Sequence, residues 1–243
     1  MLEALAGLSI PRIVPTLDGR RHVLVDGRAL HVFSACAGEI GAAWLLPGDT
    51  GRVRAAMTRL AELHRVLARV PAPAGCDTWL RERFARVEAL DSIDLPRDAP
   101  EVLGRIEALL ERTPGGPLQW LHGDYHLGNL LWGTGDTVAS VVDFEDVACG
   151  SAVSEAVLAL FALARQNQGE ERFAWDRSLW EAGLAAYVEA SGMDVPIQSP
   201  EQLEPLFCAY QVLIHLEAAA HRLWTLSPGI GFWPCWNRLM RTS

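Results

Sequence analysis

The chain has 243 residues, of which 50% are hydrophobic, and a formal net charge of −9 at pH 7. This is enough apolar material for one sizeable core, or for one large and one small lobe. The acidic balance argues against nucleic acid and acidic membrane surfaces as main partners, and it is compatible with a cationic substrate.

Neither a membrane span nor a basic leader can be found in the sequence. The longest apolar run, Ala156 to Ala164, is far shorter than the roughly 18 residues that cross a bilayer, and Met1-Leu2-Glu3 lacks the positive start of a signal peptide. The five Cys residues are widely spaced and form neither a metal-binding pair nor a redox pair. We therefore expect a cytoplasmic protein with reduced thiols.

The N-terminal part predicts a small antiparallel sheet. Its apolar stretches are Pro11 to Leu17, His22 to Val25 and Ala29 to Phe33. Asp18-Gly19 and Asp26-Gly27 separate them, and Asp-Gly is among the dipeptides that most favour tight hairpin turns. We expect a three-stranded meander.

Most of the remaining chain predicts helices, because apolar residues recur there at helical spacing. In the first of these segments the pattern ends at Pro71. The expected helices are Arg52–Val70, Thr78–Leu90, Pro100–Arg112, Ser151–Ala164, Trp175–Ala190 and Pro200–Trp224.

The segment from His122 to Asp146 carries the chemistry. Asp124 and Asn129 lie five positions apart, and Asp143 follows after a short hairpin. An Asp, an Asn and a second Asp in this order can supply a base for a substrate hydroxyl and two oxygen ligands for magnesium. The pattern indicates a phosphoryl-transfer centre.

The spacing has a physical reason. Asp124 follows the apolar stretch Leu118–Leu121, and Asn129 opens a short strand that ends at Trp132. Gly133 to Asp136 supply turn chemistry, and the return strand Val138–Val142 delivers Asp143 beside Asn129. Magnesium suits two such oxygen ligands, because it keeps several waters and is usually completed by substrate phosphates.

This constellation resembles the core of the aminoglycoside phosphotransferase family, the branch of the protein-kinase-like fold that includes choline kinases. The resemblance implies that Asp124 is the catalytic base, that Asn129 and Asp143 are metal ligands, and that His122 braces the loop. Glu155 stands where the family usually has a loop-supporting Asp, so the charge is kept on a longer arm. Gly123 replaces the Arg of most protein kinases, and control by loop phosphorylation is therefore not expected.

The resemblance also implies the place of the nucleotide. Ser34 to Gly38 correspond to the hinge, where backbone groups near Ser34 and Cys36 would meet the adenine ring of ATP. In the family a glycine-rich loop and a Lys strand lie upstream of the strands that lead to the hinge, whereas this chain has only about ten residues before Pro11 and contains no Lys. We expect residues 1–38 to be a remnant of the nucleotide-covering lobe and hinge, and residues 39–243 to be the catalytic and substrate lobe.

Three alternatives remain open at this point. The missing Lys and glycine-rich loop favour a noncatalytic or truncated kinase-like binding module. Leu203 to Leu206 and Phe232 to Pro234 resemble bacterial stress-response kinases that act on protein serine and threonine. His122, Asp124 and His126 match the ligand types of a zinc or iron site in a metal-dependent hydrolase.

Taken together, these features predict an α+β, protein-kinase-like domain with a reduced antiparallel N-terminal lobe and a mostly helical C-terminal lobe. Its expected activity is transfer of the γ-phosphoryl group of ATP, with Mg²⁺, to a hydroxyl of a small molecule. Asp124 would orient and deprotonate that hydroxyl, while Asn129 and Asp143 would hold the metal.

Overall fold

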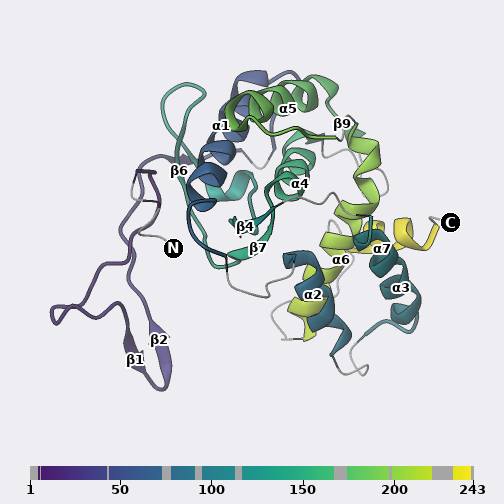
Figure 1. Cartoon of the computed structure of the whole chain (residues 1–243), viewed down its shortest axis with the longest axis horizontal. Helices are drawn as coiled ribbons and strands as arrows, with labels where there is room; N and C mark the ends of the chain where they lie inside the picture. Colours follow the sequence, from purple (N-terminus) through teal and green to yellow (C-terminus); the bar gives the residue numbers. More distant parts are fainter. Residues whose placement is uncertain are drawn as a thin grey trace.

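The structure is a computed structural model, which describes residues 5, 7–42, 44–72, 78–90, 95–112, 117–166, 174–196, 199–220 and 232–241. The helices form one body, and a hairpin near the N-terminus projects away from it (Figure 1). Short antiparallel strands are combined with a mostly helical body, which confirms the expected α+β class.

The strands are short and pair locally. They are β1 (Val23–Val25), β2 (Arg28–Leu30), β3 (Glu39–Ile40), β4 (Leu118–Leu121), β5 (Leu130–Trp132), β6 (Val138–Val141), β7 (Ala148–Ser151), β8 (Arg165–Gln166) and β9 (Ala174–Trp175). The helices are α1 (Thr50–Leu67), α2 (Trp79–Glu88), α3 (Ala99–Leu110), α4 (Ala152–Ala164), α5 (Arg177–Ser191), α6 (Glu204–Ala220) and α7 (Phe232–Arg241).

The expected meander is only partly present. β1 and β2 pair through the Asp26-Gly27 turn, whose residues have φ of 50° and 76°, as a tight hairpin requires. The first stretch, however, pairs as a single bridge between Ile13 and Phe33 rather than as a third strand. Beyond the bridge the first stretch turns back on itself, because the N–H of Thr16 donates to the oxygen of Arg20 at 2.8 Å instead of to the neighbouring strand.

Two small sheets position the segment from His122 to Asp146. β4 pairs with β7, and β5 pairs with both β3 and β6. Leu130 lies opposite Val141, which confirms the hairpin predicted between Asn129 and Val142. The chain therefore leaves one sheet at Leu121 and enters the other at Leu130, and residues 122–129 bridge the two.

The helix predictions are confirmed to within a few residues. α5 begins at Arg177 because the side chain of Asp176 accepts the Leu179 N–H at 2.9 Å, and it ends where Gly192 turns left-handed with φ of 71°. α6 is described as far as Ala220, and the end expected at Trp224 lies outside the described residues. α7 was not predicted; Pro234 lies in its first turn, where a helix tolerates a proline.

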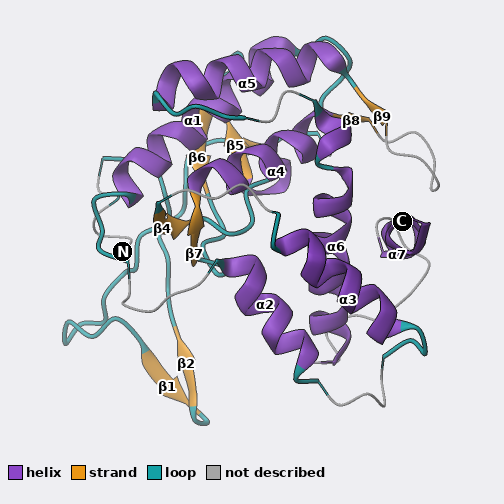
Figure 2. Ribbon diagram, turned by 45° about the vertical axis from the view of Figure 1, so that its right-hand side comes forward, coloured by secondary structure: helices purple, strands orange, loops and turns teal. Residues whose placement is uncertain are grey.

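The core gathers around α4, which packs against α1 and α5 (Figure 2). On its other side Phe161 of α4 contacts Phe207 of α6, with ring centroids 4.5 Å apart. Its apolar side chains are buried nearly all round, as befits a central helix. α5 approaches closely at Gly183, where a Cβ would lie 2.4 Å from Cδ1 of Leu160 on α4. None of the described helices is long and apolar enough to cross a membrane.

Candidate active site

A tight loop around Gly123 connects β4 to β5. Gly123 has a φ of 88°, and a Cβ at this position would lie 1.9 Å from the carbonyl oxygen of Asp146. Only glycine allows both the backbone conformation and this approach. The loop is therefore held against residues 143–146, which follow β6.

Asp124 lies at the centre of a set of hydrogen bonds. Its Oδ1 accepts the hydroxyl hydrogen of Tyr210 at 3.0 Å. Its Oδ2 lies 3.2 Å from Nε2 of His126 and also accepts from Nδ2 of Asn129 at 3.2 Å. The side chain is 29% exposed, so it is fixed by its neighbours and still reachable.

These contacts set the charge of Asp124. Burial raises the pKa of Asp124, whereas the hydrogen bond and charge of His126 and the bond from Tyr210 lower it. The lowering outweighs the effect of burial, so the net pKa lies below the usual value. The bond to Asp124 in turn raises the pKa of His126, although burial opposes this. Asp124 is therefore an ionised hydrogen-bond acceptor at neutral pH.

Asn129 is buried and has a fixed amide orientation. Its Nδ2 donates to the main-chain oxygen of Asp124 at 2.9 Å as well as to the Asp124 carboxylate. Both partners can only accept, so the nitrogen must face them. The amide oxygen of Asn129 is consequently the atom that can ligate a cation.

Asp143 follows β6 in a left-handed conformation, with φ of 64°. Aspartate enters this region more readily than most side chains. The N–H of Val142 donates to the main-chain oxygen of Asn129 at 2.9 Å, so the hairpin brings Asp143 next to Asn129, as its sequence predicted. The charge of Asp143 is the main cause that raises the pKa of Glu145 and contributes to the raised pKa of His126.

His122 is fully buried and has both ring nitrogens engaged. Its Nδ1 accepts the N–H of Asp124 at 3.3 Å, so Nε2 carries the hydrogen and donates to the oxygen of Val142 at 2.9 Å. The ring links the loop to the end of β6. His122 thus has the contacts of a bracing residue.

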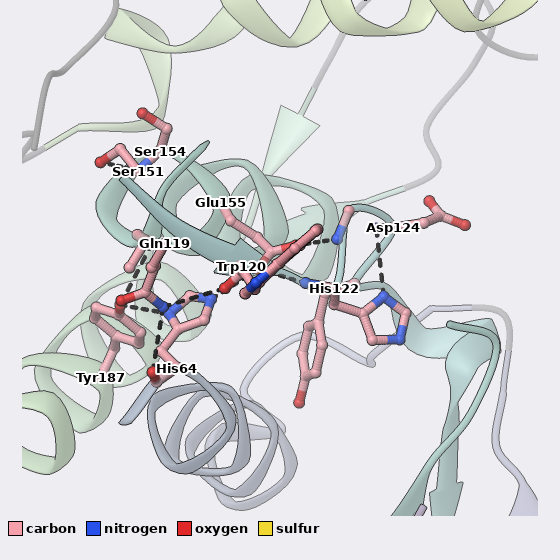
Figure 3. A network of polar contacts seen from close by, with 12 residues as sticks. His64, Gln119, Trp120, His122, Asp124, Ser151, Ser154, Glu155 and Tyr187 are labelled. Carbon is pink, nitrogen blue, oxygen red and sulfur yellow. Dashed lines mark hydrogen bonds and ion pairs between the residues drawn. The ribbon is translucent and has the colours of Figure 1, made fainter. Parts of the chain in front are cut away.

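Glu155 on α4 supports the loop from a buried position, as Figure 3 shows. Its Oε1 accepts the N–H of Gly123 at 2.6 Å, and its Oε2 accepts the N–H of His122 at 3.3 Å and lies 2.7 Å from Nε2 of His64. Burial raises the pKa of Glu155, whereas the bond and charge of His64 lower it. The lowering outweighs the effect of burial, so the net pKa lies below the usual value. The longer arm of Glu therefore reaches the loop.

His64 connects Glu155 to a further helix. It is fully buried on α1, and its Nδ1 lies 2.8 Å from the hydroxyl of Tyr187 on α5. The contacts from Tyr187 to His64 and from His64 to Glu155 connect three helices (Figure 3). The bond from the N–H of Gly123 to Glu155 joins these helices to the loop. Such a fully bonded buried network holds a unique geometry.

The donor set fits magnesium better than a transition metal. The described residues hold no group of three or more His, Cys, Asp or Glu that could bind a metal ion. The zinc or iron site expected as an alternative would need a ring nitrogen of His122, and both are engaged. The amide oxygen of Asn129 and the carboxylate of Asp143 are hard oxygen donors, and magnesium needs few protein ligands.

The hinge candidates lie in an exposed N-terminal segment. The Oγ of Ser34 accepts the N–H of Arg12 at 3.1 Å, and the N–H of Ser34 donates to the oxygen of Arg12 at 2.8 Å. Cys36 is partly exposed and is followed by Ala37, whose oxygen accepts from Oγ of Ser140 on β6 at 2.8 Å. This contact places the segment against the β5–β6 hairpin.

A cavity of about 240 Å³ opens beside Asp124. The loop forms one wall, and the helices α2, α4 and α6 contribute the others. Its residues are Trp79, Gly123, Asp124, Tyr125, His126, Leu127, Gly128, Glu155, Leu158, Ala159, Ala162, Arg165, Phe207, Tyr210 and Gln211. The cavity combines aromatic and aliphatic walls with a few polar groups, which is typical of a small-molecule site.

Two residues of this region were not found from the sequence. Tyr210 contacts Asp124 from α6, and Arg83 on α2 pairs with Asp146 at 3.2 Å and with Glu217 at 3.5 Å. Arg83 therefore ties the segment after β6 to two helices. Neither residue belongs to a local motif, so only the tertiary structure could reveal them.

Comparison with known proteins gives a consistent result. The model of the phosphotransferase enzyme family matches residues 1–206 of this chain. Among curated proteins, none has a sequence that matches.

Several solved structures resemble the chain. An amicoumacin kinase in complex with AMP-PNP, Ca²⁺ and Ami is 13% identical and has a TM-score of 0.64 over 98% of this chain and 74% of its own. Choline kinase LicA from Streptococcus pneumoniae is 14% identical, with a TM-score of 0.60 over 99% and 76%. A microcompartment-associated aminopropanol kinase is 22% identical, with a TM-score of 0.55 over 98% and 74%. These likenesses confirm the protein-kinase-like fold.

Proposed function

This chain belongs to the phosphotransferase enzyme family, and from that premise we propose that it transfers the γ-phosphoryl group of ATP to a hydroxyl of a small molecule in a magnesium-dependent reaction. The observation that carries this proposal is the position of Asp124. Its ionised carboxylate borders the cavity, and the amide of Asn129 is bonded to it. The proposed base, the proposed metal-ligating amide and a cavity that could hold a substrate therefore lie close together.

Asp124 has the properties needed to orient an acceptor hydroxyl. Its Oδ1 accepts one hydrogen bond in the structure, from Tyr210, and a carboxylate oxygen can accept a second. A substrate O–H that donates to Asp124 is aimed with its oxygen toward the phosphoryl group. As the new P–O bond forms and the bond to the leaving ADP breaks, the hydroxyl proton passes to the carboxylate.

Asn129 and Asp143 are the residues that would hold Mg²⁺. Bound there, the ion would neutralise charge on the phosphates of the nucleotide. The hydrogen bonds from Nδ2 of Asn129 to Asp124 couple the orientation of this ligand to that of the base. His122 contributes by bracing, since it joins the backbone of Asp124 to Val142, the residue before Asp143.

The adenine of ATP would lie against the segment from Ser34 to Cys36. This segment is exposed and precedes the contact between Ala37 and the β5–β6 hairpin, which carries Asn129 and Asp143 at its open end. The main-chain groups of Ser34 and Cys36 are the candidates for contacts with the ring. The adenine ring of one nucleotide could then lie at one end of this hairpin and its phosphates at the other.

The absence of Lys from the whole sequence favours a second candidate function, a noncatalytic binding module of the same fold. Kinases of this kind hold the nucleotide phosphates with a Lys, and Arg is not equivalent to it at such a site. The catalytic proposal therefore requires that an Arg of this chain contacts the nucleotide phosphates instead.

Phosphoryl transfer itself separates the two functions. The protein is incubated with ATP, Mg²⁺ and mixtures of small alcohols, and ³¹P NMR follows ADP and new phosphomonoester signals. We expect a phosphomonoester with the natural chain and none with Asp124→Ala. Binding of ATP without any transfer, over acceptors of every charge, would support the noncatalytic module.

A further inference from the structure

The charges that line the cavity beside Asp124 distinguish between classes of acceptor. In the described part of the chain, its carboxylates are Asp124 and Glu155. Both oxygens of Glu155 are occupied by His64 and by the N–H groups of His122 and Gly123. Asp124 is engaged by Tyr210 and His126 and is reserved for the hydroxyl. The described lining therefore offers no further carboxylate for a substrate cation.

Arg165 places a positive charge in the same cavity. It directly follows α4, and its guanidinium carbon lies 5.5 Å from the ring centroid of Phe207, which also lines the cavity. The side chain is largely removed from water, since burial is the main cause that lowers the pKa of Arg165. A guanidinium that has lost part of its hydration interacts more strongly with an anion than an exposed one does.

Part of the aromatic wall is already engaged by protein groups. A substrate ammonium group would bind the face of an aromatic ring, but the guanidinium of Arg165 already lies over Phe207. The ring of Trp79 packs edge-to-face against Tyr210, with centroids 5.0 Å apart. His126, whose pKa is raised by Asp124, adds a second positive charge when it is protonated.

We propose that the acceptor is an alcohol that carries a carboxylate, and that Arg165 binds this carboxylate while Asp124 binds the hydroxyl. This inference rests on the proposed phosphotransferase function. The planar guanidinium matches a carboxylate with two parallel hydrogen bonds. The apolar side chains of Leu158, Ala159 and Ala162 on α4 line the same cavity and suit a short carbon skeleton.

Matched acceptors test the proposal. 3-Hydroxypropionate, 1,3-propanediol and 3-amino-1-propanol share three carbons and a primary hydroxyl but carry negative, zero and positive charge. A second series has a larger skeleton and consists of 4-(hydroxymethyl)benzoate, benzyl alcohol and 4-(hydroxymethyl)benzylamine, again with negative, zero and positive charge. Calorimetry measures the affinity of each compound for the protein, and the same preparation is titrated with ATP and Mg²⁺.

The expected result is that the carboxylate of at least one series binds about tenfold or more tightly than its ammonium counterpart, as a charged hydrogen-bonded contact implies. Arg165→Gln should remove this preference, and Arg165→Lys should retain part of it because the charge remains. Arg54→Gln is the matched control, since Arg54 lies on α1 in an exposed pair with Glu189, and it should bind like the natural chain.

Three outcomes would overturn the proposal: equal or tighter binding of the ammonium compounds, no binding by either series, or an unchanged preference in Arg165→Gln. Should Arg165→Gln not fold, the ranking in the natural chain and in Arg165→Lys still decides. Loss of ATP binding in the same preparation would instead count against the phosphotransferase function. The two failures are therefore distinguishable.

Discussion

Tyr210 donates a hydrogen bond to Asp124 at 3.0 Å, although the two residues are 86 positions apart in the chain. The contact joins α6 to the loop between β4 and β5. Because Tyr210 also lines the cavity, the same side chain shapes the substrate site and orients the proposed base.

This contact predicts energetic coupling between the two residues. The free energy of unfolding, measured with denaturant, should show a coupling of about 1 kcal/mol or more in a double-mutant cycle of Tyr210→Phe and Asp124→Asn, since the acceptor is charged. Additive effects of the two substitutions would contradict the contact.

The His126–Asp124 pair predicts a pH dependence of stability. The pKa of His126 is raised in the folded chain, so its contribution is fully present below the unfolded value of about 6.5 and is lost as the pH rises through the folded value. Melting temperatures of the natural chain and His126→Gln should therefore differ most near pH 6 and converge at alkaline pH. The same comparison in an Asp124→Asn background should lose this dependence, and a difference that persists there would count against the pair.

Removal of Glu155 should destabilise the protein strongly. Glu155→Ala leaves two main-chain N–H groups and the ring of His64 without their buried acceptor, and loss of one partner of such a group costs about 3–5 kcal/mol. Chemical denaturation measures the loss. Glu181→Ala on α5 is the control, because Glu181 forms an exposed pair with Arg177 and should contribute no more than about 1 kcal/mol. Similar losses of stability in both variants would show that Glu155 does not stabilise the loop.

Gly123 should not tolerate a side chain. Gly123→Ala would place a Cβ 1.9 Å from the oxygen of Asp146 in a backbone of φ 88°, so we expect about 2 kcal/mol or more of destabilisation. The matched control is Gly104→Ala on α3, where no atom lies within 4 Å of the added Cβ and alanine should stabilise the helix by about 0.5–1 kcal/mol. Calorimetry should show a lower melting temperature for Gly123→Ala and a higher one for Gly104→Ala if the loop geometry is correct.

The part of this architecture that could be predicted is the part that is local in sequence. The order of Asp124, Asn129 and Asp143 and the turn residues between β5 and β6 were sufficient to predict the hairpin that joins them. The described helices other than α7 were predicted from apolar periodicity. The N-terminal meander was wrong because its first stretch forms only one bridge and then a local turn closed by Thr16 and Arg20, which the Asp-Gly pattern did not indicate.

The rest depends on contacts between distant segments. Tyr210, Arg83 and Arg165 are unremarkable in sequence, and each gains its place only when α6, α2 or the end of α4 packs beside the loop. The pairing of His64 with Glu155 joins residues 91 positions apart, which a one-dimensional pattern cannot indicate.

The most direct test of the central claim is calorimetric titration with ATP, with and without Mg²⁺, of the natural chain, Asp124→Ala and Asp143→Ala. We predict magnesium-dependent binding by the natural chain, nearly unchanged affinity in Asp124→Ala, and loss of the magnesium dependence in Asp143→Ala. Equal loss of binding in both variants, or no magnesium-dependent binding by the natural chain, would contradict the roles assigned to these residues.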